Sequence, residues 1–239
     1  MRLQANTRRR LCLVAGAAAS DAPQCGCGAA HDSGFTFGNH WHSKCKYGPV
    51  WQFIIQRHDV VRDWLARAGK ELQLHIETEL LGLYANSKGK PADVLFPSWD
   101  PQLSKKAQAV DVVVTDPRSQ TAMASGADKC SLAAASLKES KKLLDHHKMI
   151  AHHGPGIITF DRVPFAVESS GAWGKSAKAL WHKMKGKAKE IKLQNYVMAN
   201  KPRTWSAFTF GSFYSQAISF AVAKHTAQAV LRGLKSSRC

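Results

Sequence analysis

Two aspartates in the middle of the chain have the residue type and context of a metal-dependent site for phosphodiester cleavage. Asp93 follows Pro91 and Ala92 at the start of a short apolar run, and Asp111 lies in the β-branched run 110–114, 18 residues later. Two paired strands can bring such carboxylates to one Mg²⁺ ion, which prefers oxygen ligands and takes only one or two carboxylates from the protein. Many aspartates near turns only cap or solubilise the chain, so both interpretations remain open at this point.

A lysine on the element after the second aspartate would complete such a site. Lys138, Lys141 and Lys142 follow Asp111 in a segment of helical character. An ammonium group there could orient the attacking water and stabilise the charge that builds on the phosphate, while the metal acts as a Lewis acid.

The segment 25–48 has the residue types of a zinc site. Three cysteines and a histidine could hold one ion: Cys25, Cys27, His40 and Cys45. Three sulfurs and an imidazole suit tetrahedral Zn²⁺, although Cys-x-Cys is tighter than the usual Cys-x-x-Cys, and a loop with incidental thiols is the alternative. The six cysteines of the chain are too few and too unevenly spaced for a disulfide scaffold.

The charge of the chain favours a polyanionic partner. The sequence has 34 basic and 17 acidic residues, a net charge of +17, which attracts nucleic acid or an anionic membrane. The sequence contains no run of 18 apolar residues, so it predicts no membrane-spanning helix. The N-terminal arginines and the apolar run 11–19 imitate a signal peptide, but that run is short and half of it is alanine and glycine.

Two basic segments could contact DNA. The segment 174–192 contains seven lysines against one glutamate, and Lys183, Lys185 and Lys187 are its central members. Such a helix would neutralise phosphates and make binding sensitive to salt, although a solvated helix face is the alternative for any one lysine. Arg57 and His58 form a second basic pair that could reach a phosphate.

Hydrophobic periodicity predicts the elements that must position these residues. Helices are expected over 50–69, 133–149, 174–193 and 210–234, and strand-like segments over 72–83, 93–96, 110–115, 157–158 and 163–167, with a polar turn at 86–90. This order predicts an α/β fold in which helices flank one sheet. We expect three parts: a basic, weakly ordered lead-in (1–24), a zinc-knuckle-like module (25–48) and the main domain (49–234).

Ten short motifs in order support a family resemblance. They are Cys25-Gly-Cys27-Gly28, Phe37-Gly38-Asn39-His40 with Cys45, Arg57-His58-Asp59, Glu77-Thr78-Glu79, Pro91-Ala92-Asp93-Val94, Val110-Asp111-Val112, Glu139-Ser140-Lys141-Lys142, Val163-Pro164-Phe165-Ala166-Val167-Glu168, Gly171-Ala172-Trp173-Gly174 and Ser219-Phe220-Ala221-Val222-Ala223. From about residue 8 to residue 234 the chain resembles the PD-(D/E)xK, restriction-enzyme-like endonuclease domain that follows the reverse transcriptase in some non-LTR retrotransposons.

The resemblance implies a restriction-endonuclease-like mixed sheet flanked by helices, with a small N-terminal zinc module. It implies zinc on Cys25, Cys27, His40 and Cys45, and cleavage with magnesium on Asp93 and Asp111. It places the catalytic lysine at Lys142, with Lys141 as second choice, and an acidic residue at Glu79. Arg57 and His58 would help to engage DNA.

The resemblance also implies a nuclear protein that nicks DNA, with the RNA of the parent element as a further partner and with no membrane role. No Tyr-x-Asp-Asp polymerase motif occurs in the sequence. We therefore expect the chain to be a fragment of a larger element or a decayed copy that lacks the reverse transcriptase. The alternative is a zinc-containing nucleic-acid-binding module without catalysis.

Overall fold

The computed structural model describes residues 27, 40–41, 45–79, 92–97, 107–153, 160–193, 207 and 209–236. The elements are α3 (Gly48–Glu71), β1 (Glu77–Thr78), β2 (Val94–Phe96), β3 (Ala107–Thr115), α4 (Gln120–Ala124), α5 (Ala133–His153), β4 (Phe160–Glu168), α6 (Lys175–Glu190) and α7 (Phe210–Ser236). The expected lead-in (1–24), Cys25, the turn at 86–90 and the run 157–158 lie outside the described residues.

The strands form one four-stranded mixed sheet in the order β1-β2-β3-β4. The first three strands are antiparallel neighbours, and β4 runs parallel to β3. A parallel neighbour needs a crossover connection, which α4 and α5 provide between β3 and β4. The α/β fold class, a mixed sheet packed against helices, is therefore confirmed.

The strand β3 lies inside the sheet, between β2 and β4, and β4 is an edge strand. Both faces of β3 are buried, with Ala109 and Asp111 on one face and Val110 and Val112 on the other, as expected for a strand covered on both sides. Pro164 in β4 is paired in register with Asp111 of β3. A proline has no N–H to donate, so it is tolerated where one side of the strand has no further strand to pair with.

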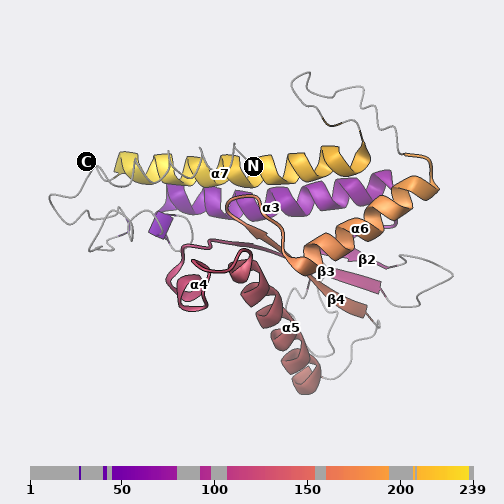
Figure 1. Ribbon diagram of the computed structural model, residues 1–239, viewed down its shortest axis with the longest axis horizontal. Coiled ribbons are helices and arrows are strands. Elements are labelled where there is room, and N and C mark those ends of the chain that lie inside the picture. The colour runs from indigo at the N-terminus through magenta and orange to yellow at the C-terminus, as the bar shows by residue number, and fades with distance from the viewer. Residues whose placement is uncertain are drawn as a thin grey trace.

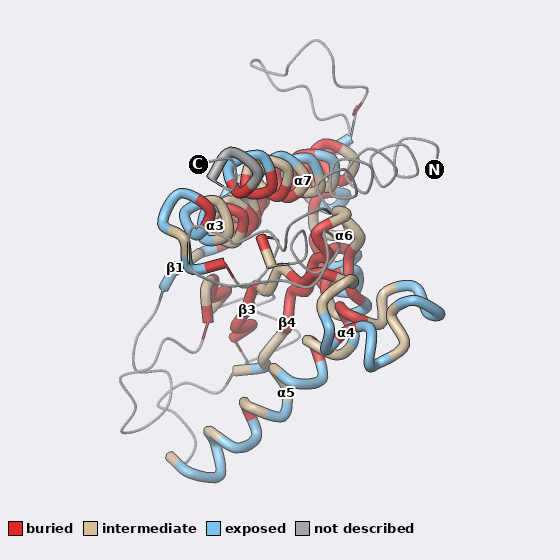
Figure 2. The backbone as a smooth tube through the Cα atoms, turned by 90° about the vertical axis from the view of Figure 1, so that its left-hand side faces the viewer, coloured by how far each residue is buried: buried red, intermediate tan, exposed pale blue. Residues whose placement is uncertain are grey.

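The first and last helices of the described chain pack against each other on one side of the sheet, while α5 lies on the other side (Figures 1 and 2). Trp64 of α3 meets the rings of Phe213 and Tyr214 of α7 edge to face, at centroid distances of 6.0 and 5.7 Å. This interface joins the buried valines of the sheet in one core, which accounts for the buried stripes along both helices in Figure 2. None of the described helices is long and apolar enough to cross a membrane.

The strand-like segment expected over 72–83 is the element that differs most from the structure. Leu72 and Leu74 point into the core as the alternation requires, but of the described part of this segment, 72–79, only Glu77 and Thr78 pair as a strand. Gln73 has φ 58°, in the left-handed region, so the chain turns out of α3 before it can extend. The other elements differ from the expected bounds by a few residues at their ends, and α4 is a short helix that the periodicity did not indicate.

The packing of α3 on the sheet predicts opposite effects for one substitution at two helical glycines. A Cβ at Gly69 would lie 2.4 Å from Ile76 Cδ1 and 2.6 Å from Phe96 Cε1, whereas one at Gly186 of α6 meets nothing within 4 Å. We expect Gly69→Ala to lower the free energy of unfolding by about 1–3 kcal/mol through overpacking. The matched control Gly186→Ala should raise it by about 0.5–1 kcal/mol, as alanine favours helix. Equal effects in urea unfolding would contradict this packing.

Candidate functional site

The pairing of β2 with β3 brings the two chosen aspartates to neighbouring positions. The backbone N–H of Asp93 donates to Val110 O at 2.9 Å, and Asp93 Oδ2 accepts the N–H of Val112 at 2.7 Å. Val110 and Val112 are the residues on either side of Asp111, so the two hydrogen bonds of Asp93 flank that aspartate. The pairing of β2 with β3 therefore places the two aspartates at neighbouring positions, just beyond the last pair, Val94 with Val110.

Asp111 is held by two cations from different elements. Lys142 of α5 donates from Nζ to Asp111 Oδ1 at 2.8 Å, and Arg162 of β4 donates from Nη2 to the other oxygen, Oδ2. The Asp111 and Arg162 side chains are only 7% and 8% exposed, whereas the Lys142 side chain is 32% exposed. The lysine chosen from the sequence thus lies at the chosen aspartate and keeps contact with solvent.

Arg162 is a member of this site that the sequence reasoning missed. It lies two residues before Pro164, the register partner of Asp111, and so points to the same face of the sheet as Asp111. The available signal was an arginine directly before the apolar run 163–167 of β4. A cation is costly to bury unless it is paired, so its presence in such a strand indicates an acidic partner nearby.

His58 of α3 is the main side-chain partner of Asp93. Its Nε2 lies 3.2 Å from Asp93 Oδ2, and this hydrogen bond raises the pKa of His58 despite partial burial. Burial raises the pKa of Asp93, but the bond and charge of His58, the N–H of Val112 and the charge of Lys142 outweigh it, so that the pKa is lowered. Lys142 therefore acts on both aspartates, and Asp93 is held in its ionised form.

Glu79 adjoins the site through its backbone. Its N–H donates to Asp93 O at 3.1 Å, with φ 55° at Glu79. The carboxylate is instead ion-paired with Arg62 of α3. The expected catalytic role of Glu79 stays a prediction. For that role the carboxylate would have to leave its ion pair with Arg62.

Arg57 lies inside the molecule rather than on the surface expected for a DNA contact. Its side chain is 3% exposed, and Nη1 donates to Thr226 Oγ1 of α7 at 3.3 Å. Burial lowers the pKa of Arg57 to about 10, although the charge of Asp116 opposes the shift. In this position the guanidinium joins α3 to α7. The neighbouring His58 is partly exposed and faces Asp93 instead.

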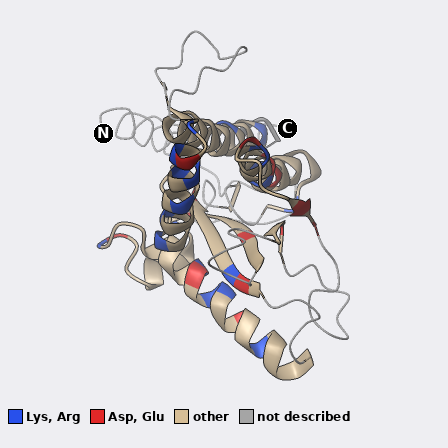
Figure 3. Cartoon of the chain, turned by 90° about the vertical axis from the view of Figure 1, so that its right-hand side faces the viewer, with Lys and Arg blue, Asp and Glu red and all other residues tan. Residues whose placement is uncertain are grey.

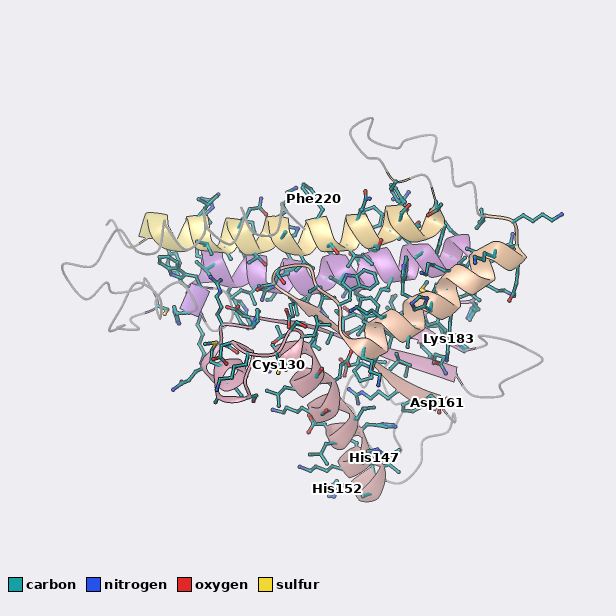
Figure 4. All side chains as sticks on the ribbon, in the orientation of Figure 1. Cys130, His147, His152, Asp161, Lys183 and Phe220 are labelled. Atoms are coloured by element: carbon teal, nitrogen blue, oxygen red, sulfur yellow. The ribbon has the colours of Figure 1, made fainter. Side chains whose placement is uncertain are left out.

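The lysines of α6 divide between two sides of the helix. Lys185 lines a groove between α6 and α7 with Trp181 and Ser212, and its stem packs over Gly211. Residues two positions apart lie about 200° apart around a helix, so Lys183 and Lys187 occupy the opposite flank. Figure 4 shows Lys183 on the side of α6 away from α7, and Figure 3 shows blue segments along most of this helix.

Three of the four expected zinc ligands come together. The ligand atoms of Cys27, His40 and Cys45 all lie within 4.8 Å of one another, with 3.1 Å between Cys27 Sγ and His40 Nε2. Two thiolates and an imidazole at this spacing fit a tetrahedral ion such as zinc. Among the described residues this is the one such group of three; Cys25, the expected fourth ligand, is not described.

The zinc-type cluster is attached to both long helices. Cys45 is fully buried and packs with Trp41, Val50 of α3 and Ala229 of α7. Trp41 lies against Gly233, where a Cβ would come within 2.3 Å of the indole ring. A metal held here would therefore stabilise the contact between the beginning of α3 and the end of α7.

Comparison with known proteins identifies no family for this chain. No protein-family model matches it, and no curated protein is detectably similar in sequence.

The cysteine–histidine cluster predicts that the purified protein holds zinc. We expect about one zinc per chain by elemental analysis, and a loss of most of it in Cys45→Ser because that thiolate is a ligand. Removal of the metal should also change the fluorescence of Trp41, which adjoins the cluster. Cys130→Ser, at an exposed thiol between α4 and α5 (Figure 4), is the matched control and should keep the metal. Equal zinc in both variants would exclude this site.

Proposed function

We propose that the chain is a magnesium-dependent DNA endonuclease domain whose centre consists of Asp93, Asp111 and Lys142. The observation that carries the proposal is the 2.8 Å contact of Lys142 Nζ with Asp111, on the strand β3 to which Asp93 is hydrogen-bonded. The two aspartates hold neighbouring positions, and Lys142 contacts the carboxylate of Asp111 while its charge also acts on that of Asp93. This is a set of groups that can hold a divalent cation and stabilise a phosphate undergoing attack.

Each side chain has a distinct task in this proposal. Asp93 and Asp111 fit magnesium because they offer two carboxylates and leave other positions to water and substrate phosphate. Bound magnesium supplies Lewis-acid activation of the scissile phosphate. Lys142, the more exposed partner of Asp111, would orient the attacking water and stabilise the developing negative charge. His58 and Arg162 would keep the two carboxylates ionised and oriented.

The same features support the likeness to the PD-(D/E)xK domain of non-LTR retrotransposons. A helix, three antiparallel strands, a crossover helix and a parallel fourth strand carry Asp93 just before β2 and Asp111 within β3. The lysine position of an Asp-x-Lys motif is Val113 here, so Lys142 of the next helix would take its role. The proposed partners are nuclear DNA and the RNA of a parent element, and the proposed structural ion is zinc.

The proposal predicts that supercoiled plasmid DNA is nicked in the presence of Mg²⁺ and not in EDTA. Asp93→Asn and Asp111→Asn should each abolish nicking because the carboxylates bind the ion. Lys142→Ala should slow it by about 10²–10³-fold, the usual loss when one charge-stabilising donor is removed. The measurement is the rate of conversion to open circles on agarose gels.

Lys141→Ala is the matched control for the lysine. Lys141 neighbours Lys142 on α5 but is exposed, so its loss removes the same charge without changing the contact with Asp111. If Lys141→Ala and Lys142→Ala slow nicking equally, the lysine assignment is wrong. If nicking persists in both aspartate variants, the proposed centre is wrong.

A non-catalytic zinc-containing module that binds nucleic acid is the second candidate. The observation that favours it is that both oxygens of Asp111 already contact cations, Lys142 and Arg162. A carboxylate held in this way would have to exchange a partner before it could bind magnesium. Tight DNA retention without cleavage in Mg²⁺ or Mn²⁺ would support this candidate over the first.

Both candidates predict a salt-sensitive contact between α6 and DNA. We expect the double variant Lys183→Gln and Lys187→Gln to weaken DNA binding and to reduce the slope of log affinity against log salt by about 2, if both lysines neutralise phosphates. The matched control, Lys185→Gln with Lys189→Gln, removes the same charge from lysines that line the groove beside α7, and should have a smaller effect. Equal losses in fluorescence anisotropy titrations would indicate a diffuse charge effect.

A further inference from the structure

The helix that carries Lys142 has little apolar packing to hold it in place. All 21 residues of α5 are described, and four of them are buried: Ala134, Ala135, Glu139 and His146. Two of these are alanines, which bury little area, and Leu144 is 54% exposed. The rotation of α5 about its axis, which decides where Lys142 points, must therefore depend on its few specific contacts.

One of these contacts joins Glu139 of α5 to the beginning of α6. Glu139 Oε1 accepts the N–H of Ser176 at 3.0 Å and lies 3.4 Å from the N–H of Ala177. The N-cap of α6 is Gly174, which has no side chain to satisfy these groups. Glu139 thus takes the place of an N-cap residue from another helix, and its negative charge suits the positive end of the α6 dipole.

The residue at position 174, a glycine, leaves room for this contact. A Cβ at residue 174 would lie 2.2 Å from Glu139 Oε1 and 2.7 Å from its Cδ, so a glycine is needed for the carboxylate to reach the helix end. Glu139 is 6% exposed, and a buried carboxylate is stable only when such donors satisfy it. Glu139 and Lys142 are three residues apart and so lie on the same side of α5.

We infer that Glu139 is a positioning residue, which through its bonds to the beginning of α6 holds α5 in the rotation that directs Lys142 onto Asp111. The inference rests on the proposed function for its catalytic consequence, but the placement of Lys142 is a property of the chain itself. It links the lysine-rich helix α6, the proposed DNA contact, to the lysine of the proposed centre.

The test measures the accessibility of one lysine, which does not require activity. Wild-type protein and Glu139→Ala are treated briefly with an amine-acylating reagent well below their unfolding temperatures, and modification is quantified by peptide mass spectrometry. We expect Lys142 to react more slowly than Lys141 in the wild type because it is ion-paired, and the two rates to become equal in Glu139→Ala. Lys185, whose stem packs over Gly211 of α7, should keep its rate, whereas a general loosening of the fold would raise it.

Three further variants decide between positioning and simple stabilisation. Glu139→Gln keeps an oxygen acceptor and should restore the protection of Lys142, whereas Gly174→Ala, which displaces the carboxylate, should remove it. Glu190→Ala at the other end of α6 breaks only a surface pair with Lys187 and should change nothing. In nicking assays, kcat for Glu139→Ala should fall by roughly 10²-fold with little change in KM, the cost of a misplaced catalytic group.

The outcomes separate this inference from the proposed function. If Lys142 stays protected in Glu139→Ala and Gly174→Ala, the inference is overturned, whatever the nicking assay shows. If Lys142 loses protection while the wild-type protein cleaves no DNA under any metal, the positioning role stands and the endonuclease proposal fails.

Discussion

The carboxylate of Asp111 lies in the middle of the central strand, and its neutralisation by Lys142 and Arg162 is the interaction on which the candidate site depends. An isolated charge at such a position would be strongly destabilising, so the aspartate needs partners from the elements on either side. Those partners belong to the crossover helix and to the parallel strand that the crossover makes possible. The ion pairs therefore tie the β3-α5-β4 unit together at the point where the proposed chemistry would occur.

The partners of Asp93 differ from those of Asp111, because they are a histidine of α3 and the backbone of β3. The exposed fractions differ accordingly, 22% for the Asp93 side chain against 7% for that of Asp111. One carboxylate is thus fixed from within the sheet, and the other at its border by a histidine that remains partly open to solvent.

The order of the elements and the neighbouring positions of the two aspartates could be predicted from the sequence, because alternation and helical periodicity report burial directly. Lys142 does contact Asp111, but its choice rested on a resemblance, since periodicity does not show which of three nearby lysines faces the strand, and its catalytic role stays a prediction. Three features had no local signal: the burial of Arg57 between two helices, the ion pair of Glu79 with Arg62 and the cap that Glu139 supplies to α6. Each depends on contacts between residues far apart in the chain, and charged residues of the same type give no sign of burial by themselves.

The antiparallel packing of α3 against α7 has a consequence for how the chain folds. The apolar face of the first described helix is covered by the last one, and Trp64 meets its aromatic partners about 150 residues later in the sequence. During synthesis α3 must therefore remain without its partner until nearly all of the domain has been made. A helix that waits in this way exposes apolar surface, so the slow step of folding should be the closure of this long-range interface rather than the formation of any single element.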